Sequence, residues 1–514
     1  MKQKEWALLL GITAVALLLR LVNLNGRSLW YDEIFTLLYA AQPAADILGG
    51  ILTQVDGAAA EVHPPLFYTL LNGWITLFGQ SHLAARALSV LCGVATVPVA
   101  YALARRLFNQ QVAIAAAVFV TIYPFHLYYS QEIRMYGFLA LAAVTAVYCF
   151  VRAWQDGGWG NWLAYSLAAA VTLYTHNLGA VFLAGLGMWL LWYWLFQERW
   201  QQWRPVVAAH LLLLLLFVPW LLVLPSQLSK VQQSFWTTPP GLVEIIQTLL
   251  VFHFGYDNQA LPGWLLPLVF FMALLIPAIL LLEARRLRAA RGLHQQPVQA
   301  TPFPAPYALL LFLAVGPVIL TLLVSQITPV FTIRSLLPSG LMYGLLVVGV
   351  LFNDHTPRPV RWGLVVPAVL VALAALVNHY QYDSFPRSPF AEAAVTLHNQ
   401  TPDEAIIIHS NKMTYFPTYY YDPTLPQVYI GDEPGSASDT LLPVTQAALG
   451  HVAVPTLETA AAAHHTVWFV IFAREIEEYE EALGQPHPHL TWLSEQYQLT
   501  AVQEINDLML FLYE

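Results

Sequence analysis

The chain has 514 residues, of which 58% are hydrophobic and only 10% are charged, and its mean hydropathy is +0.56. A soluble domain is about a quarter charged, so this composition excludes an ordinary soluble protein and indicates several membrane spans. The net charge of −9 is not that of a nucleic-acid-binding protein. Cys92 and Cys149 both lie in apolar runs, which indicates small core residues rather than a disulfide or a zinc site.

Apolar runs long enough to span a membrane as helices recur along the first three quarters of the chain. The run at 64–79, "PPLFYTLLNGWITLFG", is ambiguous, and the distribution of Lys and Arg decides it. With a cytoplasmic N-terminus and 64–79 lying along the membrane surface, the cytoplasmic loops hold most of the 22 Lys and Arg. The eleven predicted spans are 6–22, 83–104, 112–129, 136–152, 161–176, 178–196, 205–224, 262–282, 305–326, 335–352 and 362–378.

This topology predicts two domains. Residues 1–378 form a membrane domain whose first outer loop is 23–82, and residues 379–514 form an extracytoplasmic domain. The first span has no small-residue cleavage site after it and is predicted to be uncleaved. In 379–514, β-type runs alternate with helical stretches, which indicates a small α/β domain. The predicted strands are 405–410, 427–431, 466–472 and 507–513, and the predicted helices lie near 388–399 and 474–497.

Ionisable residues gather where the predicted spans meet the outer face, although the chain has few charges elsewhere. A single polar residue at the end of a span is usually an anchor or a cap. A whole set on one face, drawn from five separate segments, indicates a functional site. The set is Asp32, Glu33, His63, Glu132, Arg134, His176 and Arg334.

These residue types fit chemistry on a phosphorylated sugar. Two carboxylates could supply a base and an orienting or metal-binding partner. The guanidinium groups of Arg134 and Arg334 could neutralise a phosphate, and the histidines could add hydrogen bonds. Tyr136 shares a helix face with Glu132 if that segment is helical. Tyr31 could stack on a sugar, although an interfacial aromatic belt is the more frequent explanation for any single aromatic residue.

The same segments resemble a known superfamily. The order "WYDE", "HPPLFYTLL", "RALSVL…ARRLF", "YYSQEIRMYG", "YTHN" and "RSLLP" is similar to that of the GT-C glycosyltransferases. It is most similar to the bacterial branch grouped with protein O-mannosyltransferases and the aminoarabinose transferases of lipid A. The resemblance covers roughly residues 6–378 and does not extend to the C-terminal region.

The resemblance implies a GT-C fold, with a bundle of spans and outer-face surface helices around a cavity. It implies transfer of a sugar from a polyprenyl-phosphate donor to an acceptor at the outer face, with inversion. Asp32 would be the base with Glu33 beside it, Arg334 would hold the lipid phosphate, and Arg134 is a second candidate. His63, Glu132, Tyr136, His176 and Tyr31 are candidates for substrate binding.

The implied partners are the lipid-linked donor, membrane lipids and an acceptor that is a protein, a lipid or a glycan. No cofactor is firmly implied. Asp32, Glu33 and a histidine could ligate a divalent metal, but they lack a fixed ligand spacing and a metal is not expected. The predicted location is the plasma membrane, with the active face outside the cytoplasm.

Three alternatives stay open. A transporter or flippase of lipid-linked sugars has the same composition, although transporters usually show internal repeats and polar residues near the midplane. The chain could also be an inactive scaffold with the GT-C fold, although it keeps the acidic pair. A third alternative is an enzyme that transfers a phospho-sugar or a whole glycan.

Overall fold

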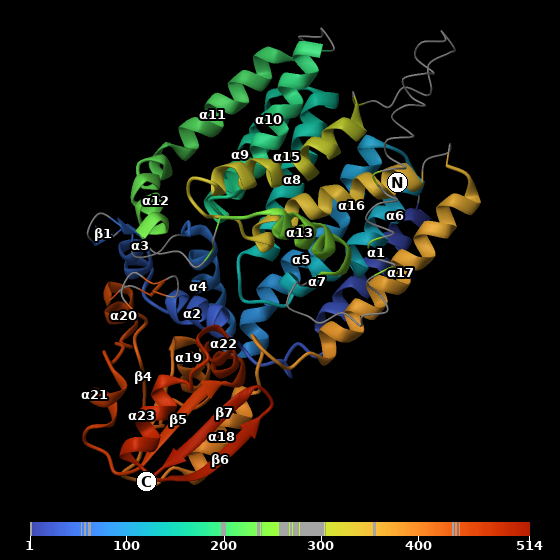
Figure 1. Ribbon diagram of the computed structural model, residues 1–514. Helices are drawn as coiled ribbons and strands as arrows, with labels where there is room; N and C mark the ends of the chain where they lie inside the picture. The colour runs from blue at the N-terminus through green and yellow to red at the C-terminus, as the bar shows by residue number, and fades with distance from the viewer. Residues whose placement is uncertain are drawn as a thin grey trace.

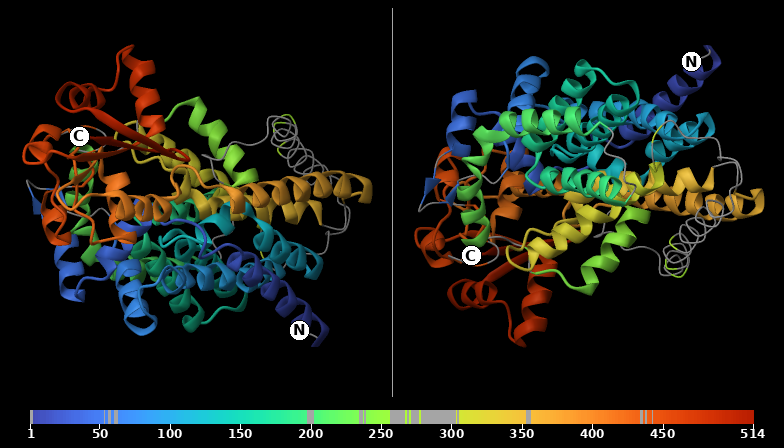
Figure 2. Two further views of the ribbon diagram at one scale, coloured as in Figure 1. Left: turned by 90° about the horizontal axis from the view of Figure 1, so that it is seen from below. Right: turned by 90° about the horizontal axis from the view of Figure 1, so that it is seen from above.

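The computed structural model describes residues 3–52, 54–55, 58–59, 63–196, 202–233, 237, 239–255, 267, 270, 277, 303, 305–352, 356–433, 436, 439–441 and 443–514. Most of the chain forms a bundle of long helices, and a small sheet region lies at one end of it (Figure 1). The two termini lie far apart in all three views (Figures 1 and 2).

The bundle consists of long, apolar helices. Within the described residues, seven helices are long and apolar enough to cross a membrane, or eight if the bent pair α6–α7 counts as one span. The long helices are α1 (Gln3–Leu21), α5 (His82–Leu107), α6 (Gln110–Ile122), α8 (Tyr136–Asp156), α9 (Trp159–Thr175), α10 (Gly179–Phe196), α11 (Trp203–Leu221), α15 (Pro306–Ser325), α16 (Leu337–Leu351) and α17 (Arg358–Gln381).

The prediction of a polytopic helical protein is confirmed, and the total of eleven spans stays a prediction. The predicted span 262–282 lies outside the described residues, apart from three isolated positions, and so does most of the linker that follows it. Each of the other predicted spans falls on a described helix. Helix α9 has 17 residues, one fewer than the length required of a span.

Shorter elements accompany the long helices, and α2, α3 and α4 lie between the bundle and the sheet (Figure 1). Helix α4 is 13 residues long, or about 20 Å at 1.5 Å per residue. This is less than the roughly 30 Å of a bilayer core, so its length fits the predicted surface helix. The short elements are α2 (Tyr31–Ala40), α3 (Ala44–Leu52), β1 (Gln54–Val55), β2 (Ala58–Ala59), α4 (Leu66–Phe78), α7 (Pro124–Ser130), α12 (Leu224–Gln233), α13 (Leu242–Phe254) and the 3₁₀ helix η2 (Ile333–Leu336).

The predicted span 112–129 falls on two helices rather than one, because the chain bends by 56° between α6 and α7. Pro124 begins α7 and has no N–H to continue the hydrogen bonds of α6. The buried guanidinium of Arg20 donates instead to the carbonyl oxygens of Val120 and Thr121, at 3.1 and 3.2 Å. The bend directs residues 131–135 toward the acidic pair, and Ile133 donates its backbone N–H to Glu33 at 3.0 Å.

The C-terminal region contains a five-stranded sheet in the order β4-β3-β5-β7-β6. Strand β3 (Ile406–His409) is parallel to β4 (Gln427–Tyr429) and β5 (Val467–Phe472), whereas β7 (Leu508–Tyr513) is antiparallel to β5 and β6 (Leu499–Ile505). The four predicted strands are present. Strand β6 was missed because it is a largely exposed edge strand without an apolar run. The helices of this region are α18 (Phe390–Gln400), α19 (Lys412–Tyr421), α20 (Pro443–Leu449), α21 (Leu457–Ala461), α22 (Ala473–Leu483) and α23 (Pro488–Gln496).

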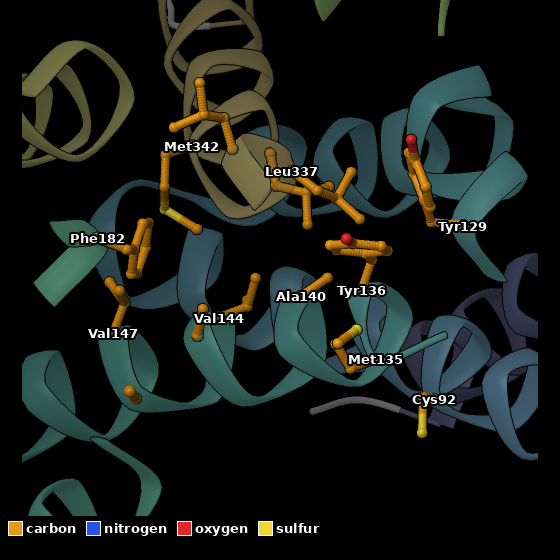
Figure 3. Packing of buried hydrophobic residues seen from close by; sticks show 14 of the residues in the cluster. Cys92, Tyr129, Met135, Tyr136, Ala140, Val144, Val147, Phe182, Leu337 and Met342 are labelled. Carbon is orange, nitrogen blue, oxygen red and sulfur yellow. The ribbon is translucent and has the colours of Figure 1, made fainter. Parts of the chain in front are cut away.

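Small residues let the membrane helices approach one another closely. A Cβ added to Gly185 of α10 would lie 2.9 Å from the carbonyl oxygen of Phe312 in α15. Between α8 and α16 the contact is made by side chains instead. Leu337 and Met342 of α16 point toward α8, and Leu337 lies beside the ring of Tyr136 (Figure 3).

We expect Gly185→Ala to lower the free energy of unfolding by about 1–3 kcal/mol, because the new methyl group forces α10 and α15 apart. Gly187→Ala on the same helix is the matched control, since nothing lies within 4 Å of its added Cβ. The control should be neutral or stabilising by up to about 1 kcal/mol. Thermal unfolding in detergent measures both, and equal melting temperatures would contradict the packing assigned to Gly185.

Candidate functional site

The acidic pair lies in the first turn of α2, where the positive end of the helix dipole favours carboxylates. Consecutive helical residues point about 100° apart, so the two side chains diverge. The side chain of Asp32 is 17% exposed, whereas that of Glu33 is completely buried. The two adjacent carboxylates therefore belong to different environments.

Asp32 faces two arginines. Arg334, from η2, donates from Nη1 to Oδ2 of Asp32 at 2.7 Å. Nε of Arg134 lies 3.9 Å from the same oxygen, and Nη1 of Arg134 donates to Oγ1 of Thr36 at 2.8 Å. Burial raises the pKa of Asp32, but Arg134 and Arg334 outweigh burial and hold this pKa below its usual value. Asp32 is therefore ionised at neutral pH.

Aromatic and imidazole rings surround this group. Cζ of Arg334 lies 5.5 Å from the centre of the Tyr136 ring, and Cζ of Arg134 lies 6.0 Å from it. The rings of Tyr136 and His176 are 5.8 Å apart, and the rings of His176 and His63 are 5.6 Å apart. The fold thus brings together six of the nine residues that the sequence nominated, from segments far apart in the chain. The six are Asp32, Arg134, Arg334, Tyr136, His63 and His176.

Tyr31 and Glu132 lie elsewhere. Tyr31 packs edge-on against Phe416 of α19, with 5.6 Å between ring centres, so it joins the outer loop to the C-terminal region. Glu132 is buried and accepts from Nη2 of Arg387 at 2.9 Å and from Nε1 of Trp30 at 3.1 Å. Burial raises the pKa of Glu132, and Arg387 opposes this rise.

Glu33 is the centre of a buried ion cluster. Arg86 donates to both of its carboxylate oxygens, from Nε at 3.0 Å and from Nη2 at 2.9 Å. Arg387 donates from Nη1 at 2.5 Å, and the backbone N–H of Ile133 donates at 3.0 Å. Burial alone would raise the pKa of Glu33, but Arg387 and Arg86 lower it to about 2. Glu33 therefore remains ionised with its hydrogen-bonding capacity largely used.

Sequence reasoning missed Arg86 and Arg387 as site residues. Both are almost completely buried, and a buried charge needs a partner. Arg86 could have been found as a cation inside an otherwise apolar run of the motif "RALSVL". Arg387 had no such signal, because it lies in the polar segment after the last span and only the tertiary structure brings it to Glu33.

An apolar cavity of about 500 Å³ lies between α6, α16 and α17. Phe252 and His253 of α13 line it together with Tyr343 of α16. A series of rings joins the cavity to the polar group, since Phe252 lies 6.1 Å from Phe125, Phe125 lies 5.5 Å from Tyr129, and Tyr129 lies 5.0 Å from Tyr136. The apolar cavity and the charged group are thus separate, and aromatic rings connect them.

No group of three or more His, Cys, Asp and Glu within the described residues is arranged to hold a metal ion. The two carboxylates of the acidic pair diverge to different arginines. The arrangement within the described ranges can hold an anion and can accept a proton at Asp32.

Known proteins match part or nearly all of this chain. A family profile described as "Dolichyl-phosphate-mannose-protein mannosyltransferase" matches residues 62–223, which is less than half of the chain. The comparison with curated proteins gave no match.

Solved structures match over nearly the whole chain. ArnT from Cupriavidus metallidurans in the apo state has a TM-score of 0.61 and 15% identity, and the match covers 100% of this chain and 98% of ArnT. The same enzyme bound to undecaprenyl phosphate has a TM-score of 0.60, 16% identity and coverages of 99% and 98%. The Archaeoglobus fulgidus oligosaccharyltransferase has a TM-score of 0.58 and 14% identity, with coverages of 93% and 71%.

The chain therefore has the fold of the GT-C superfamily of glycosyltransferases, and the predicted resemblance is confirmed. At these identities the structural matches establish the fold. The roles of individual residues rest on the geometry described above.

Replacing Glu33 by Gln should destabilise the protein by about 3–5 kcal/mol at neutral pH, because two buried arginines lose their shared counter-charge. The pKa of Glu33 is lowered in the folded state, so its contribution to stability is full above its ordinary value of 4.5 and is lost as the pH falls toward 2. The difference in melting temperature between wild type and Glu33→Gln should therefore narrow over that range.

Asp156→Asn is the control for this measurement. Asp156 forms an exposed ion pair with Arg106, and such pairs contribute about 0–1 kcal/mol. A Glu33→Gln variant as stable as this control would show that Glu33 does not hold the cluster together.

Proposed function

We propose that the protein is a membrane glycosyltransferase. It moves a sugar from a polyprenyl-phosphate donor to an acceptor by direct displacement with inversion, and Asp32 is the base. The observation that carries the proposal is the partly exposed Asp32 between Arg334 and Arg134. Undecaprenyl phosphate bound to ArnT, which shares the fold, supports the donor class.

Asp32 is better suited than Glu33 to be the base, because a base must reach the proton that it removes. Asp32 has an exposed fraction and its neighbours are the candidate phosphate ligands. Glu33 is enclosed by Arg86, Arg387 and a backbone N–H. We assign Glu33 the role of fixing the acidic loop.

The donor phosphate would change the partner of Arg334. Arg334 is paired with Asp32, and a phosphate that enters between Arg334 and Arg134 would compete for both guanidinium groups. Asp32 would then lose cationic partners and gain an anionic neighbour, so its pKa would rise. Donor binding thus prepares Asp32 to accept a proton.

The displacement then has three simultaneous parts. The acceptor hydroxyl oxygen forms a bond to the anomeric carbon, and its proton moves to a carboxylate oxygen of Asp32. The bond from the anomeric carbon to the phosphate oxygen breaks, and polyprenyl phosphate leaves. Arg334 and Arg134 stabilise the charge that develops on the leaving phosphate. Tyr136, His63 and His176 are the proposed contacts of the sugar.

The apolar cavity between α6, α16 and α17 is the proposed place of the prenyl chain. Its lining is nearly all apolar, and it adjoins the polar centre through Phe125 and Tyr129. Binding of the lipid chain there would supply binding energy away from the reacting atoms.

We further propose that the site lies outside the cytoplasm, in the plasma membrane. The site is at the end of the bundle where α5 begins and α9 ends, and Arg105, Arg106 and Arg152 lie at the opposite end, where α5 and α8 finish. Basic residues mark the cytoplasmic side. A flippase would place its polar residues near the bilayer midplane, so the location of this set at one end favours an enzyme.

The first experiment measures binding and turnover of a panel of polyprenyl-phosphate sugars by the wild type, Asp32→Asn and Arg334→Ala in nanodiscs. Asp32→Asn should bind one donor normally and lower kcat about 10²–10⁴-fold, the usual contribution of a general base. Arg334→Ala should weaken donor binding. Arg358→Ala, at the opposite end of the bundle, is the control and should leave both unchanged. Failure of every donor to bind the wild type would overturn the donor class.

The pH dependence of turnover tests whether the donor phosphate takes Arg334 away from Asp32. The acid limb of kcat/KM reports the free enzyme, in which the pKa of Asp32 is below its usual value. The acid limb of kcat reports the donor complex and should lie at higher pH, because the phosphate has taken Arg334 away from Asp32. Coincident acid limbs in the two profiles would contradict this exchange.

A further inference from the structure

Arg387 comes from a part of the chain that the proposed mechanism does not use. It lies between α17, the last long helix, and α18, the first helix of the C-terminal region. Its side chain is 1% exposed and contacts carboxylates from two segments of the membrane domain. Its two terminal nitrogens reach Glu33 at 2.5 Å and Glu132 at 2.9 Å.

The segment that carries Arg387 is anchored to the sheet. Oδ2 of Asp507, in the turn between β6 and β7, accepts from the backbone N–H of Phe385 at 2.6 Å and from Oγ of Ser388 at 3.0 Å. The ring of Phe385 packs edge-on against Phe472 of β5, with 5.4 Å between centres. Arg387 is therefore the end of a continuous set of contacts that begins in the sheet.

The carboxylates that Arg387 bridges belong to the two segments that present Asp32 and Arg134. Glu33 follows Asp32 in α2, and Glu132 lies in the same loop as Arg134, between α7 and α8. Arg387 also donates from Nη1 to the carbonyl oxygen of Ser28, at 3.1 Å, in the approach to α2. One guanidinium thus ties together the two segments that present the base and a proposed phosphate ligand.

We propose that Arg387 is a positioning residue for Asp32, which it serves by bridging Glu33 and Glu132 and so coupling the C-terminal α/β region to the transfer reaction. This inference rests on the proposed function. Arg387 acts on Asp32 through its positive charge as well as by holding the two segments in place. Without Arg387, Glu33 and Glu132 would share one fewer cation, and the excess negative charge would act on Asp32.

The charged and titratable groups around Asp32 are few enough to make this measurable. They are Arg334 from η2, Arg134 and Glu132 from the loop before α8, Tyr136 at the start of α8, His176 after α9, His63 before α4, and Glu33 beside Asp32. Loss of the positive charge of Arg387 from this set should move the acid limb of kcat to higher pH.

The test compares Arg387→Met with the double variant Arg387→Met/Glu132→Gln, which removes one cation and one carboxylate together. Arg387→Met should lower kcat at least tenfold and change the donor KM less than threefold. It should also move the acid limb of the kcat profile to higher pH. The double variant should return the acid limb to the wild-type position and recover part of the lost kcat. Charge compensation of this kind does not follow from a purely mechanical tether.

Tyr421→Phe is the matched control. The hydroxyl of Tyr421 in α19 accepts the backbone N–H of Leu29 at 3.0 Å, so it also joins the C-terminal region to the approach to α2, but it touches neither carboxylate. This variant should leave the acid limb and kcat close to those of the wild type.

If Arg387→Met does not fold, as thermal unfolding would show, Glu132→Gln alone is compared with the double variant. Glu132→Gln should move the acid limb of the kcat profile to lower pH, and the acid limb of the double variant should match that of the wild type. An unmoved acid limb in either comparison, or wild-type kcat in Arg387→Met, would overturn the inference. A wild type that turns over no donor would overturn the proposed function instead.

Discussion

The ion cluster around Glu33 is the constraint on which the rest of the site depends. A carboxylate buried without partners is very costly, so Glu33 requires the guanidinium groups of Arg86 and Arg387 in fixed positions. These arginines come from the start of α5 and from the segment after α17. The cluster therefore joins the bundle, the acidic loop and the C-terminal region, and it fixes the orientation of the first turn of α2.

That orientation gives Asp32 its own environment. Because consecutive residues of a helix diverge, fixing Glu33 inward directs Asp32 toward Arg334 and Arg134. The transfer of a sugar from the lipid phosphate would then depend on competition for these arginines between Asp32 and the phosphate. The same two guanidinium groups that keep the resting carboxylate ionised would bind the departing phosphate, so a single pair of residues would serve both the free enzyme and the reaction.

The apolar and polar parts of the site meet through aromatic rings rather than through a continuous polar surface. Phe125 and Tyr129 lie on α7, the short helix created by the 56° bend at Pro124, and they connect the cavity lined by Phe252 with the ring of Tyr136. Arg20 satisfies the carbonyl groups that the bend exposes. A break that would be unfavourable in lipid is thus stabilised inside the bundle, where it positions the loop that carries Glu132 and Arg134.

The sequence by itself determined the class of fold, the positions of most helices and strands and six members of the charged and aromatic group, because hydrophobic runs and isolated charges within them are local signals. It could not determine that Asp32 and Glu33 have separate partners, since adjacency in sequence does not say which way each side chain points. Pro124 is a local signal for the break between α6 and α7, but the support that Arg20 gives to this break from another helix is visible only in the structure. The exposed edge strand β6 has no local signal. Only the tertiary structure shows that Arg387 pairs with Glu33 and Glu132, because these partners lie some 250 to 350 residues away in the chain. Burial is what makes this pairing necessary.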